Sequence, residues 1–167
     1  MLLPAIGALL DRDLCTLRRE VEAYPDDPSL WRTVPGVSNV GGTLALHLTG
    51  NLQHYLGALL GGTSYVRDRA AEFARRDVPR SELVREIEAA RQAVKAAISR
   101  TPETKLAAEF PELIGGAMVK TGEYLMHLTT HFAFHLGQID YHRRVVTGSS
   151  TSVGPVRPAG VGSARPA

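Results

Sequence analysis

The chain contains a single cysteine, Cys15, which excludes an intrachain disulfide framework. Nothing in its composition therefore indicates an oxidising compartment. It also lacks the run of ~20 apolar residues that a bilayer span requires. The N-terminal segment MLLPAIGALLDRD has no basic stretch ahead of its short apolar run, unlike a signal peptide. We therefore expect a soluble, cytoplasmic protein without membrane association.

An excess of charge of one sign is absent as well. The formal net charge is +2 over 167 residues, and basic and acidic residues are interleaved along the chain. This balance gives no basis for nucleic-acid binding. The sequence also lacks the G-x-G-x-x-G, P-loop and G-x-S-x-G motifs, so nucleotide binding and serine-hydrolase chemistry have no support.

Sustained period-two alternation is missing, whereas apolar residues recur every three or four positions in four segments, as on one face of a helix. These segments run from about 3 to 21, 40 to 60, 81 to 98 and 121 to 147. Ser81 is the predicted N-cap of the third segment, and Gly61-Gly62 and Gly148 are the predicted ends of the second and fourth. The sequence therefore predicts an all-α, four-helix bundle over residues 1–147.

Two long connections, 24–39 and 61–80, separate the first three helices. The second is predicted to contain a short helix at 68–75, and it is long enough to cross the bundle, so helices adjacent in sequence need not be antiparallel. Residues 148–167 are rich in Gly, Pro, Ser and Ala, and we expect a flexible tail without a fold of its own.

All the histidines fall in two of the predicted helices. The second helix carries His47 and His54, and the last carries His127, His131, His135 and His142. Residues four apart are separated by about 40° around a helix and residues seven apart by about 20°. His47 and His54 are thus predicted to project the same way, and His131, His135 and His142 to share a narrow arc on the core-facing stripe.

An H-x-x-x-H pair brings two imidazoles to one metal ion, and a third from a facing helix makes a three-histidine site with open positions. Such a ligand set suits Zn, Ni or Fe(II) and does not choose among them. The alternative is that each histidine is a hydrogen-bonded core residue. Burying several imidazoles without partners is costly, and this favours the metal interpretation.

The stretch HFAFHLGQIDYHRR, with its H-x-x-x-H-x-G-Q core, resembles the last helix of the DinB-like superfamily of metal-dependent four-helix-bundle proteins. The upstream LALHLTGNLQHYLGALLGG resembles the second helix of the same superfamily, which includes bacillithiol- and mycothiol-dependent transferases. The resemblance covers about residues 1–147. It implies a bundle with a long crossover, in which the second and fourth helices are antiparallel and which often pairs into a homodimer.

By position, the resemblance implies His47, His131 and His135 as metal ligands. His54, about 10 Å further along its helix, would then lie level with His127, and the two would bond to each other or line the pocket. His142 would lie on the other side of the metal, near the start of the second helix. Asn51 and Gln138 are predicted partners for the second nitrogen of the ligating rings.

The reaction class implied is activation of a low-molecular-weight thiol or a water by the divalent metal, for attack on a small-molecule substrate. The competing hypotheses are a non-catalytic, metal-binding or stress-associated bundle, and a structural dimer whose histidines are hydrogen-bonded. A metal with one or more open coordination positions favours the enzyme, a metal closed by a fourth protein ligand favours a structural site, and no metal affinity at all favours the hydrogen-bonded dimer.

Three further residues carry weaker signals. Arg67 and Arg69, in YVRDR, are candidate anchors for the carboxylates of a thiol cofactor. We favour a solvated loop, neutralised by Asp68 and Glu72. Cys15 is interpreted as a small buried residue and not as a nucleophile.

Overall fold

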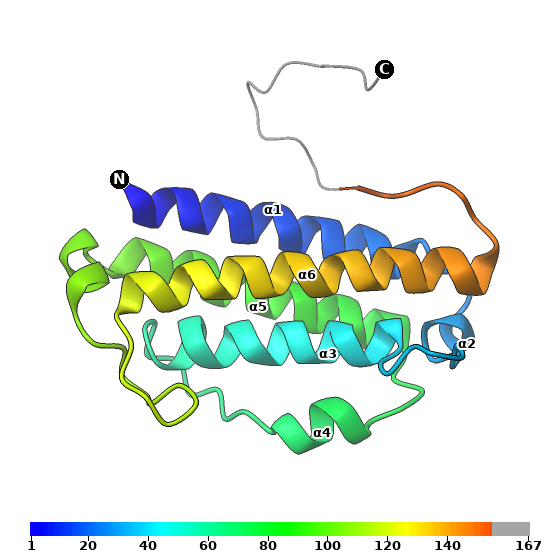
Figure 1. The fold of residues 1–167 in the computed structure, drawn as a ribbon, viewed down its shortest axis with the longest axis horizontal. Coiled ribbons are helices and arrows are strands. Elements are labelled where there is room, and N and C mark those ends of the chain that lie inside the picture. Colours follow the sequence, from blue (N-terminus) through cyan, green and yellow to red (C-terminus); the bar gives the residue numbers. More distant parts are fainter. Residues whose placement is uncertain (155–167) are drawn as a thin grey trace, which may run out of the picture.

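Four long helices build the part of the chain that the structure, a computed structural model, describes, residues 1–154 (Figure 1). They are α1 (Leu2–Glu22), α3 (Gly41–Leu52), α5 (Arg80–Arg100) and α6 (Thr121–Thr147). Shorter helical segments are α2 (Asp27–Leu30), η1 (Gln53–Ala58), α4 (Arg69–Ala74) and η2 (Glu103–Ala107). Between residues 1 and 154 there is no strand beyond the isolated bridges Glu109–Lys120 and Ile114–Ala117. The all-α prediction is confirmed.

The predicted apolar stripes form the core of the bundle. Each long helix contributes fully or almost fully buried side chains: Leu10, Leu14 and Leu17 from α1, Leu44 and Leu48 from α3, Leu83 and Ile87 from α5, and Leu128, Phe132 and Ile139 from α6. Burying one such side chain contributes about 1.5–3 kcal/mol of transfer free energy. The bundle is therefore held together by the stripes that the sequence pattern locates.

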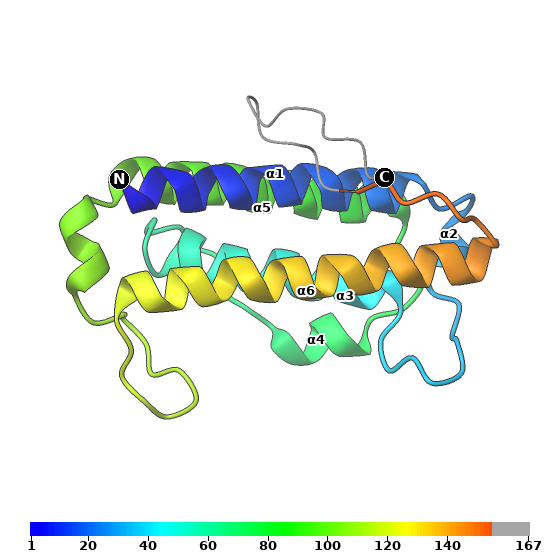
Figure 2. The ribbon, with the colours of Figure 1, turned by 45° about the horizontal axis from the view of Figure 1, so that its top comes forward.

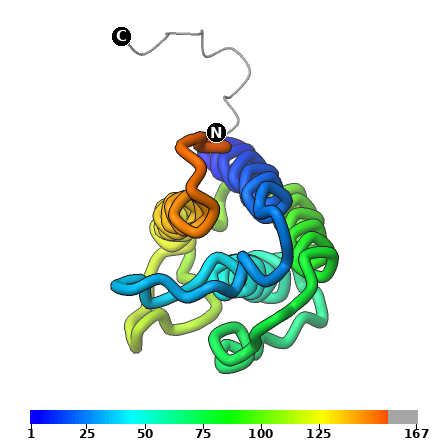
Figure 3. The backbone as a smooth tube through the Cα atoms, turned by 90° about the vertical axis from the view of Figure 1, so that its right-hand side faces the viewer, coloured from blue at the N-terminus to red at the C-terminus, as the bar shows by residue number. Residues whose placement is uncertain are grey.

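The helices pack as a square in which α1 lies beside α5 and α6, and α3 lies beside the same two (Figure 3). α1 and α6 run in one direction, while α3 and α5 run in the other (Figures 1 and 2). α3 and α5 are therefore parallel neighbours, and the crossover between them returns the chain along the outside of α3. α3 and α6 are antiparallel neighbours, so residues from one turn of each meet across their interface.

The crossover carries α4, the short helix that was expected at 68–75. Asp68 caps it by accepting a hydrogen bond from the backbone of Ala71. α4 packs against α3 on the outer side of the bundle (Figure 3). One short segment thus covers α3 at the level of its central turns.

The boundaries of two helices differ from the predicted ones. α5 begins at Arg80, because the carbonyl of Pro79 already accepts from Glu82 and Leu83, so Ser81 lies within the first turn and is not the cap. α3 stops at Leu52 and continues as the π-helical turn η1, with i→i+5 bonds from Leu59 to His54 and from Gly61 to Leu56. The predicted 3.6-residue periodicity therefore fails after Leu52.

The glycines at the ends of the second and fourth predicted helices lie where they were predicted. Gly62 (φ +70°) and Gly148 (φ +68°) adopt the left-handed conformation that residues with a side chain rarely take. After Gly148, residues 149–154 hydrogen-bond to the bundle through Thr151, which accepts from Arg143, and Ser152, which donates to Asp140. The rest of the expected flexible tail, 155–167, lies outside the described residues. No helix within 1–154 has the length and apolarity of a bilayer span.

Candidate metal centre

Three histidines from two helices converge at the α3–α6 interface. His47 comes from α3, and His131 and His135 lie one turn apart on α6. Each offers one ring nitrogen, and these nitrogens all lie within 4.8 Å of one another. The antiparallel packing of α3 and α6 brings the H-x-x-x-H pair opposite the single upstream histidine. The three residues that were predicted as ligands thus lie together at the α3–α6 interface.

Two of the three ring nitrogens are already spaced as ligands. His47 Nε2 and His131 Nε2 are 3.3 Å apart. Two nitrogens on a tetrahedral ion with Zn–N bonds of 2.0–2.1 Å lie about 3.3–3.4 Å apart. This pair of nitrogens is therefore spaced as two ligands of one divalent ion are, and His135 supplies the third imidazole of the group.

The α6 pair is held in the neutral form that binds metals. Burial, together with the neighbouring His135, His47 and His127, lowers the pKa of His131 to about 4. Burial also lowers the pKa of His135. At neutral pH both rings carry an unprotonated nitrogen, so a metal ion does not have to displace a proton from either.

A buried carboxylate fixes the orientation of His47. His47 Nδ1 lies 3.0 Å from Glu72 Oε2, and Arg67 Nη2 lies further away, at 3.4 Å. The shorter contact indicates that Nδ1 carries the proton and donates to Glu72, which leaves Nε2 free to face His131. This carboxylate comes from α4.

Arg67 completes the arrangement on the other side of Glu72. Its Nε and Nη2 donate to the two Glu72 oxygens at 2.7 and 2.9 Å. Burial opposes ionisation of Glu72, but the hydrogen bonds from Arg67 and His47 outweigh it and lower the pKa of the carboxyl group. The expectation of a solvated loop is wrong for this pair, whose side chains are only 10% and 6% exposed.

Neighbouring residues of the loop and of α4 take other places. Asp68 caps α4 and does not neutralise Arg67, while Arg69 lies over the ring of Phe73. Phe73 in turn packs against the His47 ring, with centroids 4.9 Å apart. The sequence carried no sign that separates Glu72 from a surface acid, because its role depends on where the crossover places α4.

The His135 ring has a partner of its own. His135 Nδ1 lies 2.6 Å from Gln138 Oε1, so the imidazole donates and the amide oxygen accepts. Nε2 of His135 is then the nitrogen available to an ion. Gln138 thus contacts His135, whereas Asn51 is buried within α3.

Of the other three histidines, His127 is a neighbour of the group, with its ring centroid 5.8 Å from that of His131. His54 Nε2 bonds to Glu112 Oε2 at 3.0 Å, while His127 stacks on Tyr124 with the ring planes 15° apart. His142 is buried near the start of α3, where Nδ1 lies 2.7 Å from the Tyr24 hydroxyl and Nε2 donates to the Arg32 carbonyl at 2.9 Å. Cys15 is a free, half-buried thiol on α1.

The family model for mycothiol S-transferases matches residues 5–148, which is the bundle up to the end of α6. The chain belongs to this mycothiol S-transferase family. The resemblance to DinB-like proteins is thereby confirmed, since the family is one of them. No curated protein matches the chain closely enough to serve as a relative. The mycothiol S-transferase family indicates a thiol S-transferase-like enzyme that acts on small molecules.

Proposed function

We propose that this member of the mycothiol S-transferase family is a metal-dependent transferase. In the proposal His47, His131 and His135 hold one divalent ion and mycothiol is the sulfur nucleophile. The observation that carries the proposal is the convergence of three imidazole nitrogens within 4.8 Å, in a chain of this family. Zn, Ni and Fe(II) all suit such a ligand set.

When bound, the ion supplies positive charge that favours the deprotonated form of a coordinated thiol at neutral pH. The residues of the chain supply the rest. Glu72 and Gln138 each accept the Nδ1 proton of one ring and thereby direct its Nε2 into the site. Three protein ligands, and not four, leave room for the sulfur of the substrate.

The site is partly buried, with His47 buried and His131 and His135 half-buried, and this supports a nucleophilic role. His47 is 6% exposed, and the ion pair of Arg67 with Glu72 covers the side of its ring opposite the ligand nitrogen. A thiolate in such surroundings has fewer water molecules to displace before it attacks. Because thiol chemistry needs a reduced thiol, we place the protein in the cytoplasm. The homodimer stays a prediction.

The experiment combines metal content with thiol-dependent turnover. We would measure metal by elemental analysis and follow 1-chloro-2,4-dinitrobenzene with and without mycothiol. In this reaction a sulfur–carbon bond forms, the carbon–chlorine bond breaks, chloride leaves with the electron pair and the thiol proton passes to the buffer. The expected result is about one equivalent of divalent metal and consumption that depends on mycothiol.

The variants are the double substitution His131→Ala/His135→Ala and, as a matched control on the same helix, His127→Ala. The double variant should lose both metal and turnover, while His127→Ala keeps the metal. Protein that binds no divalent metal, or turnover that persists in the double variant, contradicts the proposal. Hydrolysis of ester substrates without any thiol would point instead to activation of water.

A further inference from the structure

A cavity of about 430 Å³ opens beside the candidate metal centre, between the C-terminal half of α6, the start of α3 and the loop ahead of it. Its walls include Val37 and Asn39 from the loop, Leu44 from α3, and Tyr141 and Val145 from α6. The volume lies within the range of small-molecule sites, about 300–1,000 Å³. The cavity is therefore large enough for an aromatic substrate.

The cavity borders the metal centre through one shared residue. His135 belongs both to the three-histidine cluster and to the cavity wall. Gln138, which accepts from His135 Nδ1, lines the cavity as well. A molecule in the cavity thus has one end beside the histidine cluster, where the proposed function puts the thiol sulfur.

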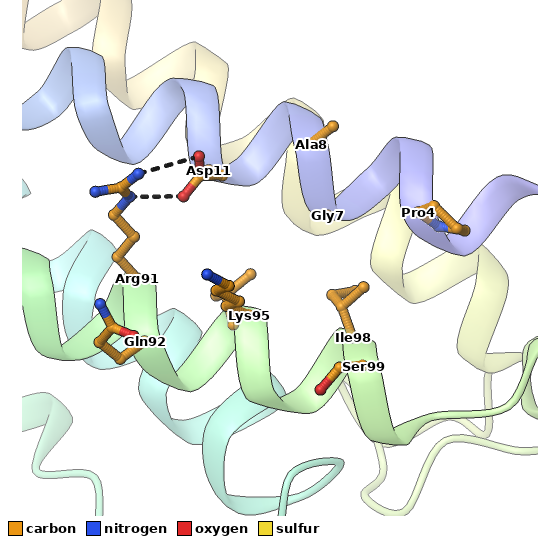
Figure 4. A pocket seen from close by; sticks show the side chains of 10 residues that line it. Pro4, Gly7, Ala8, Asp11, Arg91, Gln92, Lys95, Ile98 and Ser99 are labelled. Atoms are coloured by element: carbon orange, nitrogen blue, oxygen red, sulfur yellow. Dashed lines mark hydrogen bonds and ion pairs between the residues drawn. The ribbon is translucent and has the colours of Figure 1, made fainter.

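Among the residues of the described part of the chain that line this cavity, none is Asp, Glu, Lys or Arg. The groove between α1 and α5, in contrast, contains charged side chains. Arg91 pairs there with Asp11 at 2.6 Å, and Lys95 lies nearby (Figure 4). His142, which also lines the cavity, uses both ring nitrogens on Tyr24 and Arg32. The wall thus combines apolar side chains, those of Val37, Leu44 and Val145, with neutral polar ones, among them Ser38, Asn39 and Gln138.

Three large apolar side chains are left in solvent around this cavity. Val37 is 43% exposed, Tyr141 66% and Val145 60%. Apolar groups gathered at a half-open cavity indicate a ligand that covers them, since their burial is favourable. Mycothiol, a polyhydroxylated thiol, would match the polar side chains of the wall but would place hydroxyl groups against Val37, Val145 and the Tyr141 ring. The second substrate, the electrophile, is the better occupant.

We propose that this cavity binds the apolar, uncharged part of the electrophile, with Val37, Tyr141 and Val145 as its contact residues. The inference rests on the proposed function for the identity of the nucleophile. It adds the substrate class: a neutral electrophile with an aromatic or similarly apolar body. Small polar electrophiles gain little from the cavity.

The first test measures binding without turnover. N-phenyl-1-naphthylamine is neutral, is not an electrophile, and fluoresces more strongly in apolar surroundings. Val145→Lys and Val37→Asp put a charge on opposite walls, and both positions are exposed, so the bundle should keep its helical content. Ala8→Lys, in the α1–α5 groove, is the matched control. Each cavity variant should raise the Kd of the probe about tenfold, and Ala8→Lys should leave it unchanged.

The second test uses two electrophiles. Val145→Lys and Val37→Asp should raise the KM for 1-chloro-2,4-dinitrobenzene, with little change in the KM for mycothiol or for iodoacetamide, which is small and polar. Probe binding that none of the cavity variants weakens, or equal loss with both electrophiles, overturns the inference. Probe binding needs no metal, so wild-type protein that binds the probe but shows no mycothiol-dependent turnover would overturn the proposed function alone.

Discussion

His47 Nδ1 donates a hydrogen bond to Glu72 Oε2 at 3.0 Å, and this bond joins α3 to α4, the short helix within the crossover. The two residues are 25 positions apart, and the chain between them leaves α3, passes through η1 and returns along the outside of the bundle. The consequence is chemical, because one tautomer of His47 is selected and its Nε2 faces His131. α4 is therefore part of the candidate metal centre, although it contributes no ligand.

Replacing Glu72 should weaken metal binding. Glu72→Gln keeps an acceptor for His47 but removes the charge and leaves Arg67 without its ion-pair partner. Loss of such an outer partner typically costs 10–100-fold in metal affinity, and we expect about that change in the Kd for Zn²⁺, measured by competition with a chromophoric chelator. Glu112→Gln, which alters the partner of His54, is the control and should leave the Kd unchanged. Equal affinities for Glu72→Gln and the wild type would refute the orienting role.

Gly50 leaves the space that Glu72 occupies. A Cβ at this position would collide with Glu72 Oε1 and lie 2.9 Å from its carboxyl carbon. Gly50→Ala should therefore push the carboxylate away from His47 and weaken Zn²⁺ binding in the same direction as Glu72→Gln. It should add little in the Glu72→Gln background, since the two substitutions act on one contact.

The control for Gly50 is Gly57→Ala. A Cβ there meets Ala93 Cβ at 3.1 Å, away from the histidine cluster. It crowds the contact with α5 and is expected to change stability but not the Kd for Zn²⁺. If both glycine variants lost metal equally, general loosening of α3 would explain the effect, and not displacement of Glu72.

Local periodicity was enough to locate the long helices and the histidine faces. His131 and His135 are one turn apart on a helix that keeps its 3.6-residue period over its whole length, so their shared direction could be read from the sequence. The π turn at Gln53–Ala58 could not, because it depends on how the chain leaves the bundle toward Gly62. The prediction that His47 and His54 project the same way assumed 3.6 residues per turn, and this assumption does not hold beyond Leu52.

The sequence pattern could not predict the contacts of residues that meet only through tertiary structure. Glu72 and Arg67 stand in a segment that reads as a charged loop, and only the path of the crossover buries them. His142 was expected near the start of α3, and its partners, Tyr24 and the Arg32 carbonyl, come from the connection between α1 and α3. Long-range contacts of this kind have no local signal.

His142 should make the stability of the metal-free protein depend on pH. Burial lowers the pKa of His142, although the Arg32 carbonyl raises it in part. The unfolded chain therefore binds the proton first, and stability falls as the pH drops below about 6.5, the ordinary value for histidine. Tyr24, the other facing group, stays protonated because burial raises its pKa.

His142→Gln measures this contribution by difference. Glutamine keeps a donor for the Arg32 carbonyl but does not titrate, so the free energy of unfolding of the wild type relative to the variant should be larger at pH 8 than at pH 5. Urea denaturation in the presence of a chelator gives both values, and the remaining histidines cancel in the comparison. A difference that is independent of pH would show that His142 does not change its protonation on unfolding.

Arg143 and Glu20 form a buried ion pair between α6 and α1, 2.6 Å apart and only 4% and 1% exposed. Burial raises the pKa of Glu20 even though Arg143 opposes this, which shows how costly the carboxylate is in this position. Arg143→Met should lower the free energy of unfolding by about 3–5 kcal/mol, because it leaves a buried charge without a partner.

The double variant Glu20→Met/Arg143→Met should recover most of that loss, since two apolar side chains of similar length replace the pair. If the double variant were as unstable as Arg143→Met, the destabilisation would come from lost packing or from the bonds of Arg143 to Asp140 and Thr151, and not from an unpaired Glu20.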